Sequence, residues 1–403
     1  MTAQAQLAEA IRAAPDDDEP RLVYADAIAA TEPERGELIA LQCALAAGTL
    51  ARDAAIAARH RERELLAAHG ARWADVGGLA AQVSFARGFV DAATVHAGVF
   101  VARGAELLAR APGLRRVDLA TLVHPRSLVP DDGQSLPTTA IPLVGAVSEA
   151  PHLRAVRMLG VPAVFVRTVA GPTRELTPVV LGYLRRAGVL GVLQGLAIGQ
   201  LDYRARVLPG YAVLGELAKL RDLELARLEP HDVIALAEAG VAPRRFRAAL
   251  AGPEFGLPAA ALGSLARDAD DLGVVDSVAG LTDATRARVR KLAVLAGDPA
   301  LADAELPALQ ELELVDDASS PRPLRDARWL APLLAARGVR PRVLALRVRL
   351  APGAIAAVAA SPLGRALELI AIPPAFDHRD DGRGADFDGM IADTVDAAPV
   401  VLP

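Results

Sequence analysis

The residues with the clearest potential for chemistry form an acidic stretch near the N-terminus, "PDDDEPRLVYAD", Pro15 to Asp26. Clustered carboxylates can act as general acids or bases, or they can bind a metal ion. The same residue types also begin helices, because an Asp side chain accepts hydrogen bonds from orphan N–H groups and proline is tolerated in the first turn. We therefore expect a helix with Asp18 as its N-cap, and an ion pair from Asp26 to Arg21 or Arg35.

Nucleophiles and metal ligands are scarce. The single cysteine, Cys43, lies on a predicted helix between Leu41 and Leu45, which favours a buried small hydrophobe over a catalytic thiol that would need an activating base. No G-x-S-x-G or Walker A motif occurs. The histidines show no H-x-x-x-H spacing and predict no zinc site. They are His60, His69, His96, His124, His152, His231 and His378.

A second acidic stretch, "DHRDDGRGADFD", lies near the C-terminus. Asp377, Asp381, Gly382 and Asp388 match positions 1, 5, 6 and 12 of a calcium loop. Arg379 stands at position 3, however, and position 12 is not glutamate, so we interpret residues 374–403 as an acidic and irregular tail.

The charge of the protein disfavours two classes of partner. A net charge of -5 gives no overall attraction to nucleic acid or to an anionic membrane. The most apolar stretch is interrupted by Arg185 and Arg186, and no signal peptide is recognisable at the N-terminus. With a single cysteine as well, we expect a cytoplasmic protein.

The elements that must position any site change character along the sequence. Residues 2–70 show helical spacing, such as Leu38, Leu41 and Leu45 on one face. After Trp73, β-branched residues and glycines in short runs predict strands.

A loose repeat begins near residue 105, with alternating apolar residues in "PGLRRVDLATL", "LAKLRDLELARL", "LPALQELELVDD" and "VLALRVRL". The pattern L-x-x-L-x-L followed by a helical return is typical of a leucine-rich repeat. We predict an α/β protein in which a small helical module precedes a degenerate leucine-rich-repeat-like solenoid of short parallel strands and helices; the alternative is an irregular α/β layer fold. The sequence has no asparagine, so Asp, Ser, Thr or water must satisfy the turns. Residues 122–150 and 230–288 have poor periodicity.

Residues 7–46 resemble the bacterial repeat-companion domain, through the acidic loop, "RLVYAD", "PERGELI" and "LQCAL". The pieces "ELLAAHGARW" and "FARGFV" also fit. The family usually has tryptophan where this sequence has Ala27. The resemblance implies a module that accompanies repeats and takes part in protein interaction, with no catalytic activity to transfer. We assign residues 1–74 to this module, 75–110 to connecting strands and a first cap, 111–373 to the solenoid and 374–403 to the tail.

Alternation along the predicted strands places polar residues on the face opposite the leucines. This predicts an acidic central stripe flanked by arginines, which a protein partner would contact. The predicted contact residues are Arg116, Asp118, Arg157, Asp222, Glu224, Glu311, Glu313, Arg347 and Arg349.

The sequence therefore favours a non-catalytic scaffold that binds an unidentified protein and carries no cofactor or metal. The rival reading is an enzyme or toxin-like effector with a site at the junction of module and repeats, around Asp26, His69, Trp73 and His96.

Overall fold

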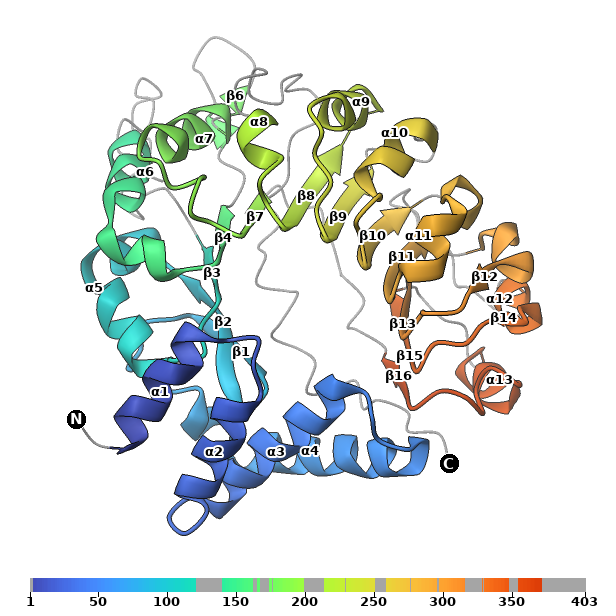
Figure 1. Ribbon diagram of the computed structural model, residues 1–403, viewed down its shortest axis with the longest axis horizontal. Helices are drawn as coiled ribbons and strands as arrows, with labels where there is room; N and C mark the ends of the chain where they lie inside the picture. The colour runs from blue at the N-terminus through green and yellow to red at the C-terminus, as the bar shows by residue number, and fades with distance from the viewer. Residues whose placement is uncertain are drawn as a thin grey trace, which may run out of the picture. The chain divides into compact units, whose positions relative to one another are not determined.

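The protein alternates helices with mostly parallel strands and is a mixed α/β protein, as expected (Figure 1). It forms two compact units, one within Met1–Pro162 and the other within Ala163–Ala385. The computed structural model describes residues 3–120, 140–161, 165–166, 174–175, 177–198, 214–228, 230–250, 259–275, 277–295, 297–315, 328, 330–347 and 354–371.

The first unit begins with the helices α1 (Ala3–Ala13), α2 (Glu19–Ile28), α3 (Pro33–Ala47) and α4 (Arg52–Trp73). Prolines stand in the first turns of α2 and α3, where a missing N–H costs nothing. Helix α3 ends at Gly48, whose φ of 67° is the left-handed conformation common at helix C-termini. These helices occupy the range where the sequence predicts a helical module.

Two apolar clusters hold this module together. One joins α1, α2 and α3 to the first residue of β2, through Ile11, Ala25, Ile28, Ile39, Cys43 and Phe89. The other contains Leu38, Leu65 and Trp73. Ala27, where the resembled family has tryptophan, is exposed, so its small side chain leaves no gap in either cluster.

The rest of the first unit is a small sheet with helices, and its strands after Trp73 confirm that expectation. Strands β1 (Gln82–Ala86) and β2 (Phe89–Val95) form an antiparallel hairpin. Strands β2, β3 and β4 then pair in parallel. The other elements are α5 (Ala97–Arg110), β3 (Arg116–Leu119), α6 (Ala140–Glu149), the 3-10 helix η2 (Pro151–Ala155) and β4 (Met158–Val161).

The second unit contains a parallel sheet whose strands follow one another in sequence order. They are β7 (Gly195–Ile198), β8 (Asp222–Leu228), β9 (Arg245–Leu250), β10 (Asp271–Val275), β11 (Lys291–Leu295), β13 (Glu311–Val315), β15 (Val343–Arg347) and β16 (Leu369–Ala371).

Helical segments return the backbone between these strands. They include α7 (Thr177–Arg186), α8 (Leu214–Leu217), α9 (Pro230–Glu238), α10 (Ala259–Leu265), η3 (Val278–Gly280), α11 (Asp283–Arg288), η4 (Pro299–Asp303), α12 (Ala331–Ala335) and α13 (Ala354–Ala360). Two short sheets also occur, β5 (Phe165–Val166) with β6 (Arg174–Glu175), and β12 (Glu305–Leu306) with β14 (Gly338–Val339).

The sheet of the second unit has one apolar and one polar face. Helices α9 to α13 lie on one side of it (Figure 1). Alternate strand residues such as Leu223, Leu292, Leu312 and Leu344 are fully buried. Within the described ranges, no helix is long and apolar enough to cross a membrane.

Residues 230–288, which lack clear leucine periodicity, nevertheless form regular elements. Strands β9 and β10 pair in parallel with their neighbours. Phe246 fills the buried position that leucine takes in β8, and Gly273 interrupts the alternation in β10. A helix precedes each strand, so these residues depart from the leucine pattern in residue type and not in secondary structure.

One turn has the kind of capping that the absence of asparagine requires. The Asp298 carboxylate accepts hydrogen bonds from the N–H groups of Val278 (2.8 Å) and Ala300 (3.0 Å). Ser277 Oγ donates to the same carboxylate at 2.9 Å. The two turns after β10 and β11 are therefore joined by Asp and Ser, as the sequence predicts.

Candidate functional site

A row of charged residues crosses the polar face of the second unit, at the start of five neighbouring strands. We call it the strand-face row, and it consists of Asp222, Arg245, Asp271, Lys291 and Glu311. The strand register places each directly beside the next. The sign of the charge therefore alternates from strand to strand, at a separation of about 4.8 Å.

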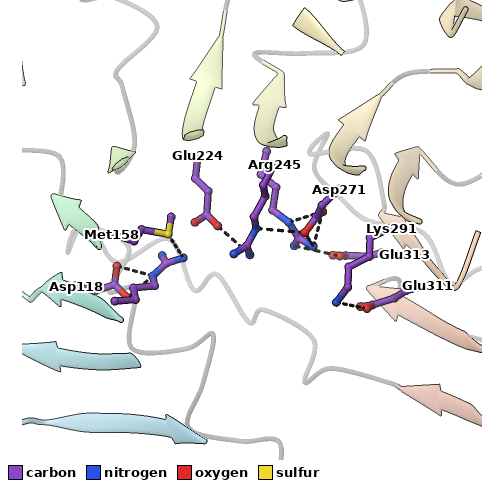
Figure 2. A network of polar contacts seen from close by, with 10 residues as sticks. Asp118, Met158, Glu224, Arg245, Asp271, Lys291, Glu311 and Glu313 are labelled. Carbon is purple, nitrogen blue, oxygen red and sulfur yellow. Dashed lines mark hydrogen bonds and ion pairs between the residues drawn. The ribbon is translucent and has the colours of Figure 1, made fainter. Parts of the chain in front are cut away.

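Ion pairs join Arg245 to Asp271 and Lys291 to Glu311 within this row, as Figure 2 shows. Lys291 Nζ lies 2.7 Å from Glu311 Oε2. Arg245 reaches two carboxylates, Glu224 at 3.0 Å and Asp271 at 3.2 Å. Its Nε is buried and has no aligned hydrogen bond, so this contact to Asp271 is an ion pair by distance only. Attraction without an aligned hydrogen bond is weaker, so the Arg245–Asp271 pair is weaker than a hydrogen-bonded ion pair.

A second row, two residues further along the strands, continues the network. Arg247 donates to Asp271 at 3.1 Å and approaches Glu313 at 3.8 Å. Arg347 lies 2.6 Å from the other oxygen of Glu313. To reach β13 from β9, the Arg247 side chain must pass β10 and β11. Gly273 makes this passage feasible, since a Cβ there would stand 2.6 Å from Arg247 Cα.

Burial and charge oppose each other in these pairs. Burial alone lowers the pKa of Arg247, but the carboxylates of Asp271, Glu313 and Glu224 outweigh it and the net pKa is raised. The pKa of Asp222 is raised by burial, although Arg245 and Arg221 act in the other direction. The network thus offsets the cost of burying the Arg247 charge.

A third line of pairs lies immediately before the strands. Arg244 lies 2.5 Å from Asp270, and Arg290 donates to Gln310 Oε1 at 2.9 Å. Arg342 forms an ion pair with Glu368. Each pair joins neighbouring strands, so the charges also hold adjacent strands in register.

The sequence predicted part of this surface. Asp222, Glu224, Glu311 and Glu313 do lie on the polar face, as alternation required. They are not an acidic stripe, however, because Arg245, Arg247 and Lys291 stand between them, and Arg347 pairs with Glu313 instead of forming a separate basic end. Arg349 lies outside the described residues, as do Asp377, Asp381, Gly382 and Asp388 in the acidic tail.

The residues that sequence reasoning missed are Arg245, Arg247, Asp271 and Lys291. The signal was present in "RRFRAAL", where Arg245, Phe246 and Arg247 alternate with a period of two. Because Phe246 stands where the repeat pattern has leucine, that alternation matched no repeat.

In the first unit, the predicted contact residues separate. Arg116 and Asp118 share one face of β3 and pair at 2.7 Å. Arg157 was expected beside them but lies ahead of β4, because residues 151–155 form a 3-10 helix and the register pairs Arg116 with Met158. The Arg157 guanidinium instead approaches Asp16 at 3.2 Å.

The three aspartates of the opening stretch contact different partners. Asp16 lies 3.0 Å from Arg115, in addition to its contact with Arg157. Asp17 accepts a hydrogen bond from the Glu19 N–H at 3.0 Å. Asp18 stands at the N-cap position of α2, but its side chain makes no capping hydrogen bond, and it approaches Arg87 Nε at 3.1 Å. Asp18 therefore joins the loop to the β1–β2 turn, which corrects its expected role.

The expected ion pair of Asp26 is also absent from the described residues. Asp26 is exposed. Arg21 is 1% exposed and donates to the backbone carbonyl of Asp17 at 2.6 Å, whereas Arg35 packs against aromatic rings. Both arginines face the interior, away from an exposed carboxylate.

Cys43 is buried and unpaired with any other cysteine, as expected of a small hydrophobe. Burial raises the pKa of its thiol to about 12, and the neighbouring Asp18 adds to the shift. The thiol therefore stays protonated and unreactive near neutral pH.

The rival site at the junction comes together only in part. His69 stacks on Trp73 with ring centroids 5.2 Å apart. Asp26 and His96 are exposed, and neither makes a side-chain ion pair or hydrogen bond with a described residue. Among those residues, no group of three His, Cys, Asp or Glu side chains is placed to hold a metal ion.

Comparison with known proteins gave no match: no protein-family model fits this sequence, and no curated protein is significantly similar to it.

Proposed function

We propose that this protein is a non-catalytic scaffold that binds a protein partner through the polar strand face of a leucine-rich-repeat-like solenoid. The observation that carries the proposal is the strand-face row, which displays charges from five consecutive strands on the side of the sheet opposite α9 to α13. Repeat proteins use such faces for binding, because each unit contributes a few residues to one extended surface.

The repetitive architecture supports the solenoid part of the proposal. Neighbouring strands begin roughly 20 to 30 residues apart, the spacing of leucine-rich units. The residue two positions before a strand is buried in each case, as in Leu193, Leu220, Val289 and Leu309. The Ser277–Asp298 contact joins consecutive turns, as the asparagine of a typical unit would.

The proposal of a repeat-companion module is supported by contacts among the segments that resemble that domain. Arg87 and Gly88 belong to "FARGFV", Gln42 to "LQCAL" and Asp18 to the acidic loop. The Gly88 N–H donates to Gln42 Oε1 at 2.5 Å, and Arg87 pairs with Asp18. Pieces far apart in the sequence thus meet at one hairpin turn, which is what a single module requires.

The charge pattern indicates the chemistry of the partner. The strand-face row mixes three acids with two bases, so a partner with only one sign of charge gains little from it. A partner with alternating charges on its surface, such as a helix with opposite charges three or four residues apart, matches the spacing of the row. Partly exposed ion pairs contribute little individually, so exchanging them for intermolecular pairs costs little.

The test is a pull-down with Lys291→Gln/Glu311→Gln, which removes two opposite charges and keeps net charge and side-chain size. The matched control is Arg103→Gln/Glu106→Gln, a similarly exposed pair on α5. Partners captured by wild type from native lysate should be lost with the first variant and retained with the second. Cross-linking should map those partners to β8, β9, β10, β11 or β13. Equal recovery with both variants would show that the strand face is not the binding surface.

A further inference from the structure

Arg35, at the start of α3, is surrounded by aromatic rings from three other elements. Its guanidinium carbon lies 5.1 Å from the ring centroid of Trp73, 5.6 Å from that of Phe85 and 5.7 Å from that of Phe89. Each is a cation–π contact, which stabilises the positive charge in a poorly hydrated place.

Arg35 has no hydrogen-bond acceptor for its guanidinium among the described residues. Arginines elsewhere in this unit, such as Arg87 and Arg115, approach carboxylates. None of the Arg35 nitrogens is buried without a hydrogen-bond partner, so these nitrogens remain in contact with solvent. The guanidinium is therefore held by its faces while its hydrogen-bonding edge stays available.

Burial lowers the pKa of Arg35 to about 10, and Arg72 lowers it further, whereas Tyr24 and Glu32 act in the opposite direction. Arg35 remains protonated at neutral pH. The lowered pKa means that burial disfavours the charged guanidinium and that the neighbouring groups do not fully offset this cost. An added anion would offset more of it.

Trp73 and Arg72 add donors to the same place. The indole Nε1 of Trp73 is buried and has no hydrogen-bond partner. Arg72 lies 5.9 Å from the Trp73 ring centroid, is exposed, and makes no side-chain hydrogen bond with a described residue. Two guanidinium groups and an orphan N–H thus lie around one indole ring.

We infer that Arg35, with Arg72 and the rings of Trp73, Phe85 and Phe89, forms a binding site for a carboxylate group. The two oxygens of a carboxylate match the paired N–H groups of a guanidinium edge, and the rings suit the apolar stem behind it. The ligand is an acidic side chain, a peptide C-terminus or a free carboxylic acid. This site is separate from the strand-face row and stands without the scaffold proposal.

The local backbone favours a carboxylate over a phosphate. Phosphate sites at helix N-termini use several free N–H groups. Here Pro33 has no N–H, and the N–H groups of Arg35 and Gly36 both donate to the Glu32 carbonyl at 3.1 Å. The Glu32 side chain is the nearby negative charge that a ligand must tolerate, and it forms no ion pair with Arg35 within the described residues.

The experiment follows Trp73 fluorescence in the full-length protein with the substitution Trp329→Phe, because Trp73 and Trp329 are its only tryptophans. Sodium acetate is titrated against sodium chloride at constant ionic strength. We expect a saturable change in emission. Arg35→Lys keeps the charge but loses the guanidinium fork, so acetate should bind at least ~10-fold more weakly. Glu32→Gln removes the competing charge and should tighten binding.

The control variant is Arg103→Gln, an exposed arginine on α5, which should leave the acetate response unchanged. Circular dichroism checks that each variant is folded. If Arg35→Lys does not fold, Arg72→Gln and Glu32→Gln decide, with opposite expected effects on affinity. No saturable acetate response, an equal response in Arg35→Lys, or binding of inorganic phosphate without acetate would overturn the inference.

Discussion

Asp18 Oδ1 and Arg87 Nε lie 3.1 Å apart, although the residues belong to different parts of the first unit. Arg87 has a φ of 51°, a conformation that non-glycine residues seldom adopt. It also donates to the backbone carbonyls of Pro15 (3.3 Å) and Asp16 (3.2 Å). These contacts hold the residue in its unfavourable conformation and attach the β1–β2 turn to the acidic loop.

Replacing Arg87 should separate the effect of the contacts from that of the backbone. Arg87→Ala loses the ion pair and both hydrogen bonds and keeps the unfavourable φ, so we expect a loss of about 2 kcal/mol in the free energy of unfolding. Arg87→Gly loses the same contacts but adopts this φ freely, and should be about 1 kcal/mol more stable than Arg87→Ala. Urea denaturation measures both. Equal stabilities would mean that the backbone at residue 87 is not strained.

Asp271 should be the most sensitive acid of the strand face, because it approaches both Arg245 and Arg247 and its side chain is only 15% exposed. Asp271→Asn leaves two guanidinium groups short of a negative charge, and we expect it to lower the free energy of unfolding by about 2 kcal/mol. Asp268→Asn is the matched control, because Asp268 is exposed and lies at a looser 3.5 Å from Arg267. This substitution should change the free energy of unfolding by less than about 0.5 kcal/mol. Urea denaturation in low salt and in 1 M NaCl tests both, and a similar loss in the two variants would contradict the network.

Cys43 should make the stability of the fold depend on pH in alkaline solution. Its thiol pKa is raised from 9.0 to about 12, so between these values the unfolded state loses the proton while the folded state keeps it. The stability is fully present below pH 9 and falls as pH rises toward 12. Cys43→Ala lacks this contribution, so the difference from wild type should change between pH 8 and 10.5 in urea unfolding. A constant difference would contradict a buried thiol.

The sequence predicted those features that depend on short-range spacing. Helices α1 to α4 and strands β8, β13 and β15 follow from leucine positions and from prolines at helix starts. The burial of Cys43 follows in the same way, from its apolar neighbours along a helix.

Features that depend on pairing between distant residues could not be predicted from the sequence. Nothing in the opening stretch shows that Asp18 meets Arg87 and not the helix N-terminus, because that choice is made by a hairpin far along the sequence. The prediction of an acidic stripe was wrong for a related reason. It considered Glu224 and Glu313 only within their own strands, whereas Arg245 and Arg247 on β9 balance their charge.

The alternating signs of the strand-face row limit how such a protein can change length. Removing the segment that contains β11 would bring Asp271 beside Glu311, two like charges at the distance between adjacent strands. Removing β10 and β11 together would bring Arg245 beside Glu311 and restore attraction. Deleting or duplicating two neighbouring strands between β9 and β13 therefore keeps opposite charges side by side. Deleting or duplicating one strand places like charges side by side and is opposed electrostatically.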